Sequence, residues 1–236
     1  MNLQVLPDPD QVASRAAAII AAEARAAVQS RGRFAVAVSG GRTPWAMLRV
    51  LNSMELPWGS VHVVQVDERI APEDHQDRNL THLIASLAGN GHTAVPHIHA
   101  MPVGVTDIDA AAAQYARTLS DVAGSPPVLD LVHLGLGTDG HTASLIPGDP
   151  VLDVADADVA VTGPYQDRRR ITLTYPILNR ARRVLWVVTG EDKAAMLARL
   201  FRGDRTIPAG RIRQDHATVV ADQAAARQVA ATLPGS

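Results

Sequence analysis

The sequence FAVAVSGGRTPWAMLRVL, residues 34–51, contains three parts of one structural unit. Residues 34–38 are all apolar, and unbroken apolar runs of this length are typical of strands covered on both faces, as in parallel sheets. Residues 39–44 contain the glycine, serine and proline that favour a tight turn. Apolar residues then recur at helical spacing over residues 44–54. The stretch therefore predicts a strand, a turn and a helix in that order.

This unit recurs along the chain. Further apolar runs lie at residues 61–66, 129–136, 184–188 and 217–221, and helical patterns lie at residues 10–30, 79–88, 108–122, 191–201 and 222–232. Alternation of strands and helices predicts a doubly wound α/β fold with a mostly parallel, Rossmann-like sheet. Residues 159–175 instead predict two strands around a Gly163-Pro164 turn, and thus a small antiparallel insert. No linker or repeat interrupts the pattern, so we expect residues 1–236 to form a single α/β domain.

The composition narrows the possible function classes. With 22 basic and 24 acidic residues the formal net charge is −2, so no positive excess is available to hold a nucleic-acid backbone. No run of about 18 apolar residues suggests a membrane span. The chain has no cysteine, which excludes disulfides and thiolate chemistry. We expect a cytoplasmic protein, monomeric or homodimeric, that acts on a small molecule and binds neither nucleic acid nor membrane.

The turn at residues 39–44 has the character of an anion site. In an open parallel sheet, ligands bind beyond the carboxyl ends of the strands, so the loops that follow the strands are the candidates. Ser39-Gly40-Gly41 provides a tight turn with bare backbone, and Thr43 and Pro44 suit the cap and first position of the following helix. Free N–H groups at a helix N-terminus bind anions. The turn therefore predicts a phosphate site.

Three further loops bring titratable residues to the same edge. Asp67-Glu68-Arg69 follows the strand at 61–66, and one of the two acids could orient a substrate hydroxyl or a water. In the glycine-rich loop after residue 136, His141 could act as a general base, because the pKa of a histidine side chain is ordinarily about 6.5, with Asp139 fixing its tautomer. Lys193 lies in the first turn of a predicted helix, where a bound anion would offset its conflict with the helix dipole.

Other interpretations of these motifs are weaker. Gly135-x-Gly137-x-x-Gly140 matches the dinucleotide-binding fingerprint, but the prolines that follow at residues 147 and 150 cut short the helix that the fingerprint needs. Ser39 nearly matches the nucleophile elbow of a serine esterase, but it follows the first predicted strand. His97-x-His99 has metal-ligand spacing without an evident third ligand, so we expect a surface pair and no metal. Within Arg168-Arg169-Arg170, one side chain could reach the site.

Taken in order, the motifs resemble the glucosamine-6-phosphate isomerase/6-phosphogluconolactonase family. The resemblance covers nearly the whole chain, and its segments are SGGRTP (39–44), VDER (66–69), GLGTDGHTASLIPG (135–148), RRITLTYPILNRAR (169–182) and TGEDKAAML (189–197). It implies a sugar-phosphate isomerase type of fold and hydrolysis of 6-phosphoglucono-1,5-lactone to 6-phosphogluconate without a cofactor or metal.

The resemblance also implies a role for each matching residue. His141 would be the general base with Asp139 as its neighbour, and Asp67 and Arg69 would line the sugar end. The residues expected to hold the phosphate are Ser39, Gly40, Gly41, Arg42, Thr43, Arg170 and Lys193. The role of Asp77-Arg78-Asn79, where such lactonases often have Asp-Ser-Asn, stays open.

Two positions favour the lactonase branch of this family. The related deaminases carry a glutamate five residues after the histidine, where this chain has Ile146, and a tyrosine after the Asp-Glu pair, where it has Arg69. A sugar-phosphate isomerase or deaminase, and a sugar-phosphate-binding regulator without turnover, remain the alternatives.

Overall fold

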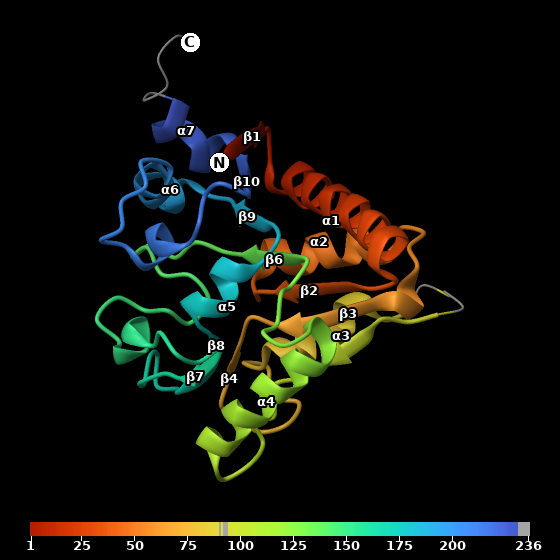
Figure 1. Ribbon diagram of the computed structural model, residues 1–236. Coiled ribbons are helices and arrows are strands. Elements are labelled where there is room, and N and C mark those ends of the chain that lie inside the picture. Colours follow the sequence, from red (N-terminus) through yellow and green to blue (C-terminus); the bar gives the residue numbers. More distant parts are fainter. Residues whose placement is uncertain (90, 92–93, 231–236) are drawn as a thin grey trace.

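A seven-stranded parallel sheet forms the centre of the molecule. The computed structural model describes residues 1–89, 91 and 94–230. Figure 1 shows the sheet, whose strands run in the order β1 (Asn2–Leu6), β10 (Ala217–Asp222), β9 (Val184–Val188), β6 (Leu131–Leu134), β2 (Phe34–Val38), β3 (Val61–Gln65) and β5 (His97–His99). The mostly parallel sheet predicted from the apolar runs is thereby confirmed.

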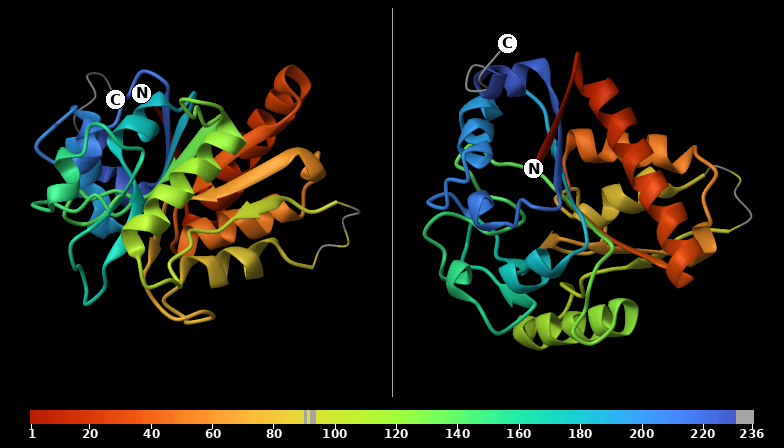
Figure 2. Two further views of the ribbon diagram at one scale, coloured as in Figure 1. Left: turned by 60° about the horizontal axis from the view of Figure 1, so that its bottom comes forward. Right: turned by 45° about the horizontal axis from the view of Figure 1, so that its top comes forward.

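Helices cover both faces of this sheet, as the right-hand view of Figure 2 shows. The helices on one face are α1 (Pro9–Arg31), α2 (Arg42–Asn52) and α3 (Asn79–Leu87), and those on the other are α4 (Ile108–Ala123), α5 (Tyr175–Arg180), α6 (Ala194–Phe201) and α7 (Gln223–Ala230). Phe34, Val36 and Val38 of β2 pack toward α1 and α2, whereas Ala35 and Ala37 pack toward α4. Because both faces are buried, the strand is apolar at every position. None of the helices formed by the described residues could cross a membrane.

A second, three-stranded antiparallel sheet lies beside the first. It consists of β4 (Asp67–Arg69), β8 (Arg170–Leu173) and β7 (Val159–Val161), and the antiparallel insert is confirmed. The predicted position of its turn is wrong. The chain reverses at Gln166 and Asp167, which have φ of 51° and 61°, between the paired residues Tyr165 and Arg168. The stretch 67–69, predicted as a loop, supplies the third strand.

The helix boundaries contain a further correction. Helix α2 begins at Arg42 with Gly41 as its N-cap and no side-chain cap, so Thr43 does not cap it. Short 3₁₀ turns at Trp58–Ser60, Pro150–Asp153, Glu191–Lys193 and Pro208–Arg211 complete the element order, and the end of the predicted helix 222–232 lies outside the described residues.

The order of strands determines where a ligand can bind. From β2 the chain continues outward through β3 and β5 on one side, and later strands β6, β9 and β10 add on the other side. The sheet therefore has its switch point between β2 and β6, and the loops after these two strands diverge there to opposite faces. These loops contain His141 and the serine–glycine turn, by which we mean Ser39-Gly40-Gly41.

Candidate active site

A cavity of about 460 Å³ opens at this edge of the sheet. It is lined by residues from loops far apart in sequence, namely Ser39, Gly40, Gly41, Arg42, Trp45, Asp67, Arg69, Asn79, His82, Gly135, Leu136, Gly137, His141, Ala143, Arg170 and Lys193. The structure thus brings together the four loops that the sequence singled out. Of the predicted site residues, Asp139 and Thr43 are not part of the lining.

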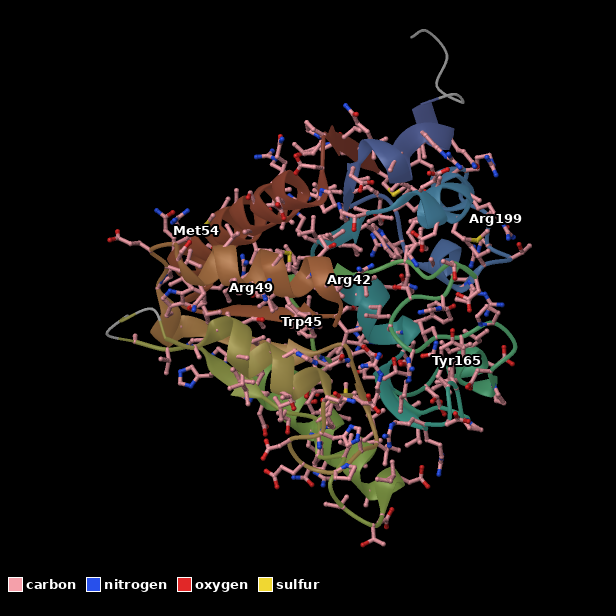
Figure 3. All side chains as sticks on the ribbon, turned by 180° about the vertical axis from the view of Figure 1, so that it is seen from behind. Arg42, Trp45, Arg49, Met54, Tyr165 and Arg199 are labelled. Atoms are coloured by element: carbon pink, nitrogen blue, oxygen red, sulfur yellow. The ribbon has the colours of Figure 1, made fainter. Side chains whose placement is uncertain are left out.

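The serine–glycine turn passes through a narrow gap. A Cβ atom on Gly40 would lie 2.2 Å from Oδ1 of Asn79 and 3.0 Å from the Trp45 ring, so no larger residue fits. Gly41 has φ of 136°, which other residues rarely adopt. Figure 3 shows Arg42 and Trp45 side by side at the N-terminal end of α2. The turn therefore presents bare backbone at the start of this helix.

Ser39 and Thr43 form hydrogen bonds with residues outside the cavity lining. The Ser39 backbone N–H donates to Nδ1 of His133 (3.2 Å), and its hydroxyl donates to the His133 carbonyl (3.1 Å). The Thr43 hydroxyl pairs with that of Thr189 at 2.8 Å. The imidazole of His133 accepts the Ser39 backbone N–H and makes no bond to the hydroxyl, so the two side chains do not form the nucleophile and base of a serine esterase. Ser39 also follows the second strand, since β1 precedes β2.

Four cations line the cavity, against the single carboxylate of Asp67. The side chain of Arg42 forms no hydrogen bond or ion pair with the residues that the structure describes. The Lys193 ammonium forms an ion pair with its neighbour Asp192, at 3.1 Å. The excess of positive charge suits a phosphate group.

Arg170 is the buried member of these cations. It is 4% exposed, and in the described structure its Nε has no hydrogen-bond partner. Its guanidinium otherwise lies 3.4 Å from the Ser144 hydroxyl, 3.4 Å from Oε1 of Gln166 and 5.1 Å from the centre of the Tyr165 ring. Burial lowers the pKa of the Arg170 guanidinium and nearby Asp67 opposes the shift, but arginine stays charged. An anion in the cavity would be attracted to this buried positive charge.

Asp67 is held in a fixed position beside this cation. Asp67 is 7% exposed, and its Oδ2 accepts a hydrogen bond of 2.5 Å from the Ser144 hydroxyl. Ser144 belongs to the same loop as His141, so this bond ties β4 to that loop. Asp67 can accept a hydrogen bond from a sugar hydroxyl or a water at this end of the cavity.

His141 and Asp139 form a hydrogen-bonded pair. Oδ1 of Asp139 lies 2.6 Å from Nδ1 of His141 and also accepts the His141 backbone N–H at 3.0 Å. Burial opposes ionisation of Asp139, but these bonds outweigh it and the pKa of Asp139 lies below its ordinary value. The carboxylate therefore accepts a hydrogen bond from a protonated Nδ1, and Nε2 is left as the basic nitrogen of the neutral ring.

Gly137 makes this pair possible. The loop closes on itself through a bond from the Gly137 N–H to the His141 carbonyl. A Cβ atom on Gly137 would lie 2.1 Å from Nδ1 of His141 and 2.7 Å from Oδ1 of Asp139. No helix starts after Gly140, where Thr142 and Leu145 form an isolated bridge, so the glycine pattern does not have the context of a dinucleotide site.

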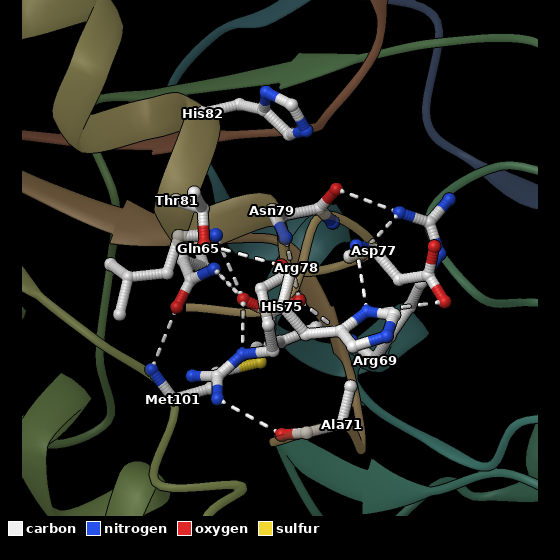
Figure 4. Close-up of polar contacts among 12 residues, drawn as sticks. Gln65, Arg69, Ala71, His75, Asp77, Arg78, Asn79, Thr81, His82 and Met101 are labelled. Carbon is white, nitrogen blue, oxygen red and sulfur yellow. Dashed lines mark hydrogen bonds and ion pairs between the residues drawn. The ribbon is translucent and has the colours of Figure 1, made fainter. Parts of the chain in front are cut away.

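Residues 77–79 are held in place by the buried carboxylate of Glu68. Glu68 is fully buried, and its Oε1 accepts the backbone N–H groups of Arg69 and Asn79, both at 2.8 Å. Arg78 lies 3.3 Å from Oε2. Figure 4 shows the result, in which Asn79 and the Asp77 carbonyl hold the Arg69 guanidinium at 3.2 and 2.9 Å. The stretch fixes Arg69 at the edge of the cavity.

Trp45 and His82 were also missed. Their rings stack at 5.7 Å and form one wall of the cavity. From its helical spacing, Trp45 was expected only to pack against the rest of the fold. His97 and His99, expected as a surface pair, lie on β5, and the His62 ring of β3 stacks against both of them. Among the described residues, no group of three or more His, Cys, Asp or Glu side chains is arranged to hold a metal ion.

Comparison with known proteins gives consistent matches. The family model for glucosamine-6-phosphate isomerases/6-phosphogluconolactonase matches residues 7–221. A 6-phosphogluconolactonase of Nostoc sp. is 37% identical over 206 residues, which cover 85% of each chain. One of Rattus norvegicus is 34% identical over 242 residues, covering 95% of this chain and 92% of the relative. The crystal structure of a 6-phosphogluconolactonase from Thermotoga maritima matches with a TM-score of 0.82 at 26% identity, covering 94% of this chain and 98% of that one.

Proposed function

Because the chain belongs to the glucosamine-6-phosphate isomerase/6-phosphogluconolactonase family, we propose that His141 is the general base with which it hydrolyses a phosphorylated sugar lactone. The chain is an ester hydrolase that converts 6-phosphogluconolactone to 6-phosphogluconate in the pentose phosphate pathway. The observation that supports the residue assignment is the hydrogen-bonded pair of Asp139 and His141 at a cavity lined with cations.

The reaction needs a base and no covalent nucleophile. Nε2 of neutral His141 takes a proton from water as the water oxygen attacks the C1 carbonyl of the lactone. The tetrahedral intermediate collapses, the bond between C1 and the ring oxygen breaks, and the protonated histidine returns its proton to that oxygen. Asp139 holds the ring in the required tautomer and stabilises its charged form, as the orienting acid does in other histidine-dependent hydrolases.

Negative charge develops on the carbonyl oxygen during the attack. We assign its stabilisation to Arg69, which Asn79 and the Asp77 carbonyl hold in place before substrate arrives. A preorganised donor of this kind contributes about 3–4 kcal/mol. Asp67 binds a sugar hydroxyl at the same end.

The phosphate lies at the opposite end of the substrate from C1. The backbone of Gly40 and Gly41, the free side chain of Arg42, and Lys193 form the phosphate subsite. The buried Arg170, which lies beside Asp67, adds positive charge to the cavity as a whole. Ser39 and Thr43 support this subsite without offering their hydroxyl groups to the phosphate, since those groups already have hydrogen-bond partners. The energy of binding the phosphate positions the ring against His141.

The lactonase is favoured over a deaminase by Ile146. This side chain is buried and occupies the position where the deaminases carry their glutamate, so no carboxyl group is available there to assist ring opening.

The test is a direct assay of lactone opening. Glucose-6-phosphate dehydrogenase generates the lactone in situ, and a second dehydrogenase reports the release of 6-phosphogluconate against an enzyme-free blank. We expect His141→Ala to lower kcat by about 10²–10⁴ while the fold is retained. His216→Ala, an exposed histidine before β10 at the opposite end of the sheet, serves as the control. Near-wild-type turnover in His141→Ala would disprove the assignment of the base, and release of ammonia from glucosamine 6-phosphate would favour the deaminase.

A further inference from the structure

His133 is a buried polar residue in the middle of the sheet that the reaction does not use. It lies on β6, is fully buried, and contacts Ser39, the first residue after β2. Its Nδ1 accepts the Ser39 N–H at 3.2 Å, and its carbonyl accepts the Ser39 hydroxyl at 3.1 Å. Both hydrogen-bond donors of Ser39 are therefore held by one residue.

These contacts lie where the chain leaves the sheet. Strands β2 and β6 are paired through Val36 with Leu131 and Ala37 with Val132. Beyond this point the imidazole of His133, a side chain, accepts the next available N–H of the departing strand. The ring thereby fixes the direction in which Ser39 enters the serine–glycine turn.

Burial of the His133 ring beside Ser39 is energetically costly. Because Nδ1 accepts an N–H, the proton of the neutral ring lies on Nε2, which has no hydrogen-bond partner in the described structure. Burial lowers the pKa of His133 to about 3, so the ring is neutral at physiological pH. A buried donor without a partner costs about 1–3 kcal/mol. An apolar side chain would avoid this cost, so the acceptor at Nδ1 is the property that distinguishes histidine here.

The turn has little freedom to absorb a shift of Ser39. Gly40 passes so close to Asn79 and Trp45 that even one added carbon would collide with them. A movement of Ser39 would therefore be transmitted to Gly40, Gly41 and the first turn of α2, whose N–H groups face the anion in the proposed function.

We propose that His133 is a positioning residue that holds the serine–glycine turn in the conformation that binds the phosphate of the substrate. The identity of the anion rests on the proposed function, whereas the contact between His133 and Ser39 does not. His133 touches neither the lactone nor the water in this arrangement. Its loss should weaken binding of the phosphate and leave proton transfer by His141 in place.

The experiment compares two substitutions of similar size. His133→Leu fills the buried space without an acceptor, and His133→Asn can place its Oδ1 where Nδ1 lies. We expect His133→Leu to raise both KM for the lactone and the dissociation constant for inorganic phosphate about tenfold, the effect of a lost hydrogen bond to an ordered site, with kcat changed less than about threefold. His133→Asn should restore both constants to within about threefold of the wild type.

Phosphate binding is measured by isothermal titration calorimetry, so it does not depend on turnover. If the wild type binds phosphate and shows no lactonase activity, the proposed function fails while the comparison of variants still tests His133. Unchanged phosphate binding in His133→Leu, or equal losses in the Leu and Asn variants, would overturn the proposal. Should His133→Leu not fold, His133→Gln, whose acceptor reaches the Nε2 position instead, takes its place in the same comparison.

Discussion

The neutral, buried ring of His133 should make the stability of the fold depend on pH. Its pKa is about 3 in the folded state and about 6.5 in an unfolded chain. Between these values the unfolded chain binds more protons than the folded one, so the free energy of unfolding falls as pH falls, by about 1.4 kcal/mol per pH unit. The stabilisation is complete above about pH 6.5 and is lost progressively toward pH 3.

The measurement compares the wild type with His133→Asn, whose side chain does not titrate. Urea denaturation followed by circular dichroism gives the free energy of unfolding of each protein at pH 7.5 and pH 5.0. The wild type should lose about 2 kcal/mol more than the variant over this range. Burial also lowers the pKa of His62 and His99, but both proteins contain these groups, so their effects cancel in the difference. Equal losses within about 0.5 kcal/mol would refute the assignment of a neutral, buried ring.

Three further substitutions test the cavity. Gly137→Ala should lower kcat at least about a hundredfold, because its Cβ would displace Nδ1 of His141. Gly104→Ala, with open space around it, is the control and should keep its kcat. Equal activity of the two variants would contradict this geometry. Trp45→Phe should abolish the change in intrinsic tryptophan fluorescence on addition of 6-phosphogluconate, since the other two tryptophans are buried in the core. A fluorescence change that persists would show that the ligand binds away from Trp45. Lys193→Ala should raise KM about tenfold with kcat changed little in steady-state assays, and a loss confined to kcat would argue against a phosphate contact.

The central strands could be predicted because burial on both faces leaves unbroken apolar runs. Strands β1 and β5 could not, since each lies at an edge of the sheet and keeps partly exposed, polar positions, as in Asn2–Leu6 and His97–His99. Helix α5, Tyr175–Arg180, is too short to show a helical period, and its first residue instead continues the alternation of the preceding strand. The turn of the insert was placed at the residues with the strongest turn propensity, but Gly163 is bound to Asp149 before the reversal.

The cavity could be predicted in outline because loops after parallel strands meet at one edge. The side chains that support it could not. Glu68, Asn79 and His133 act through contacts with residues brought close only by folding, and none of them stands in a recognisable sequence pattern for that role. The single domain, the monomeric or homodimeric state and the cytoplasmic location stay predictions.

The pairing of β1 with β10 has a consequence for how the protein is made. Strand β1 contains residues 2–6 and its neighbour contains residues 217–222, so β1 emerges from the ribosome with no strand to join. At about 5–20 residues per second, its partner follows some tens of seconds later. Until then the free backbone of β1 and the open edge of β9 are both exposed to pairing with other nascent chains. A ribosome that stalls between residues 188 and 217 therefore releases a chain with two unprotected strand edges, which we expect to depend on chaperones.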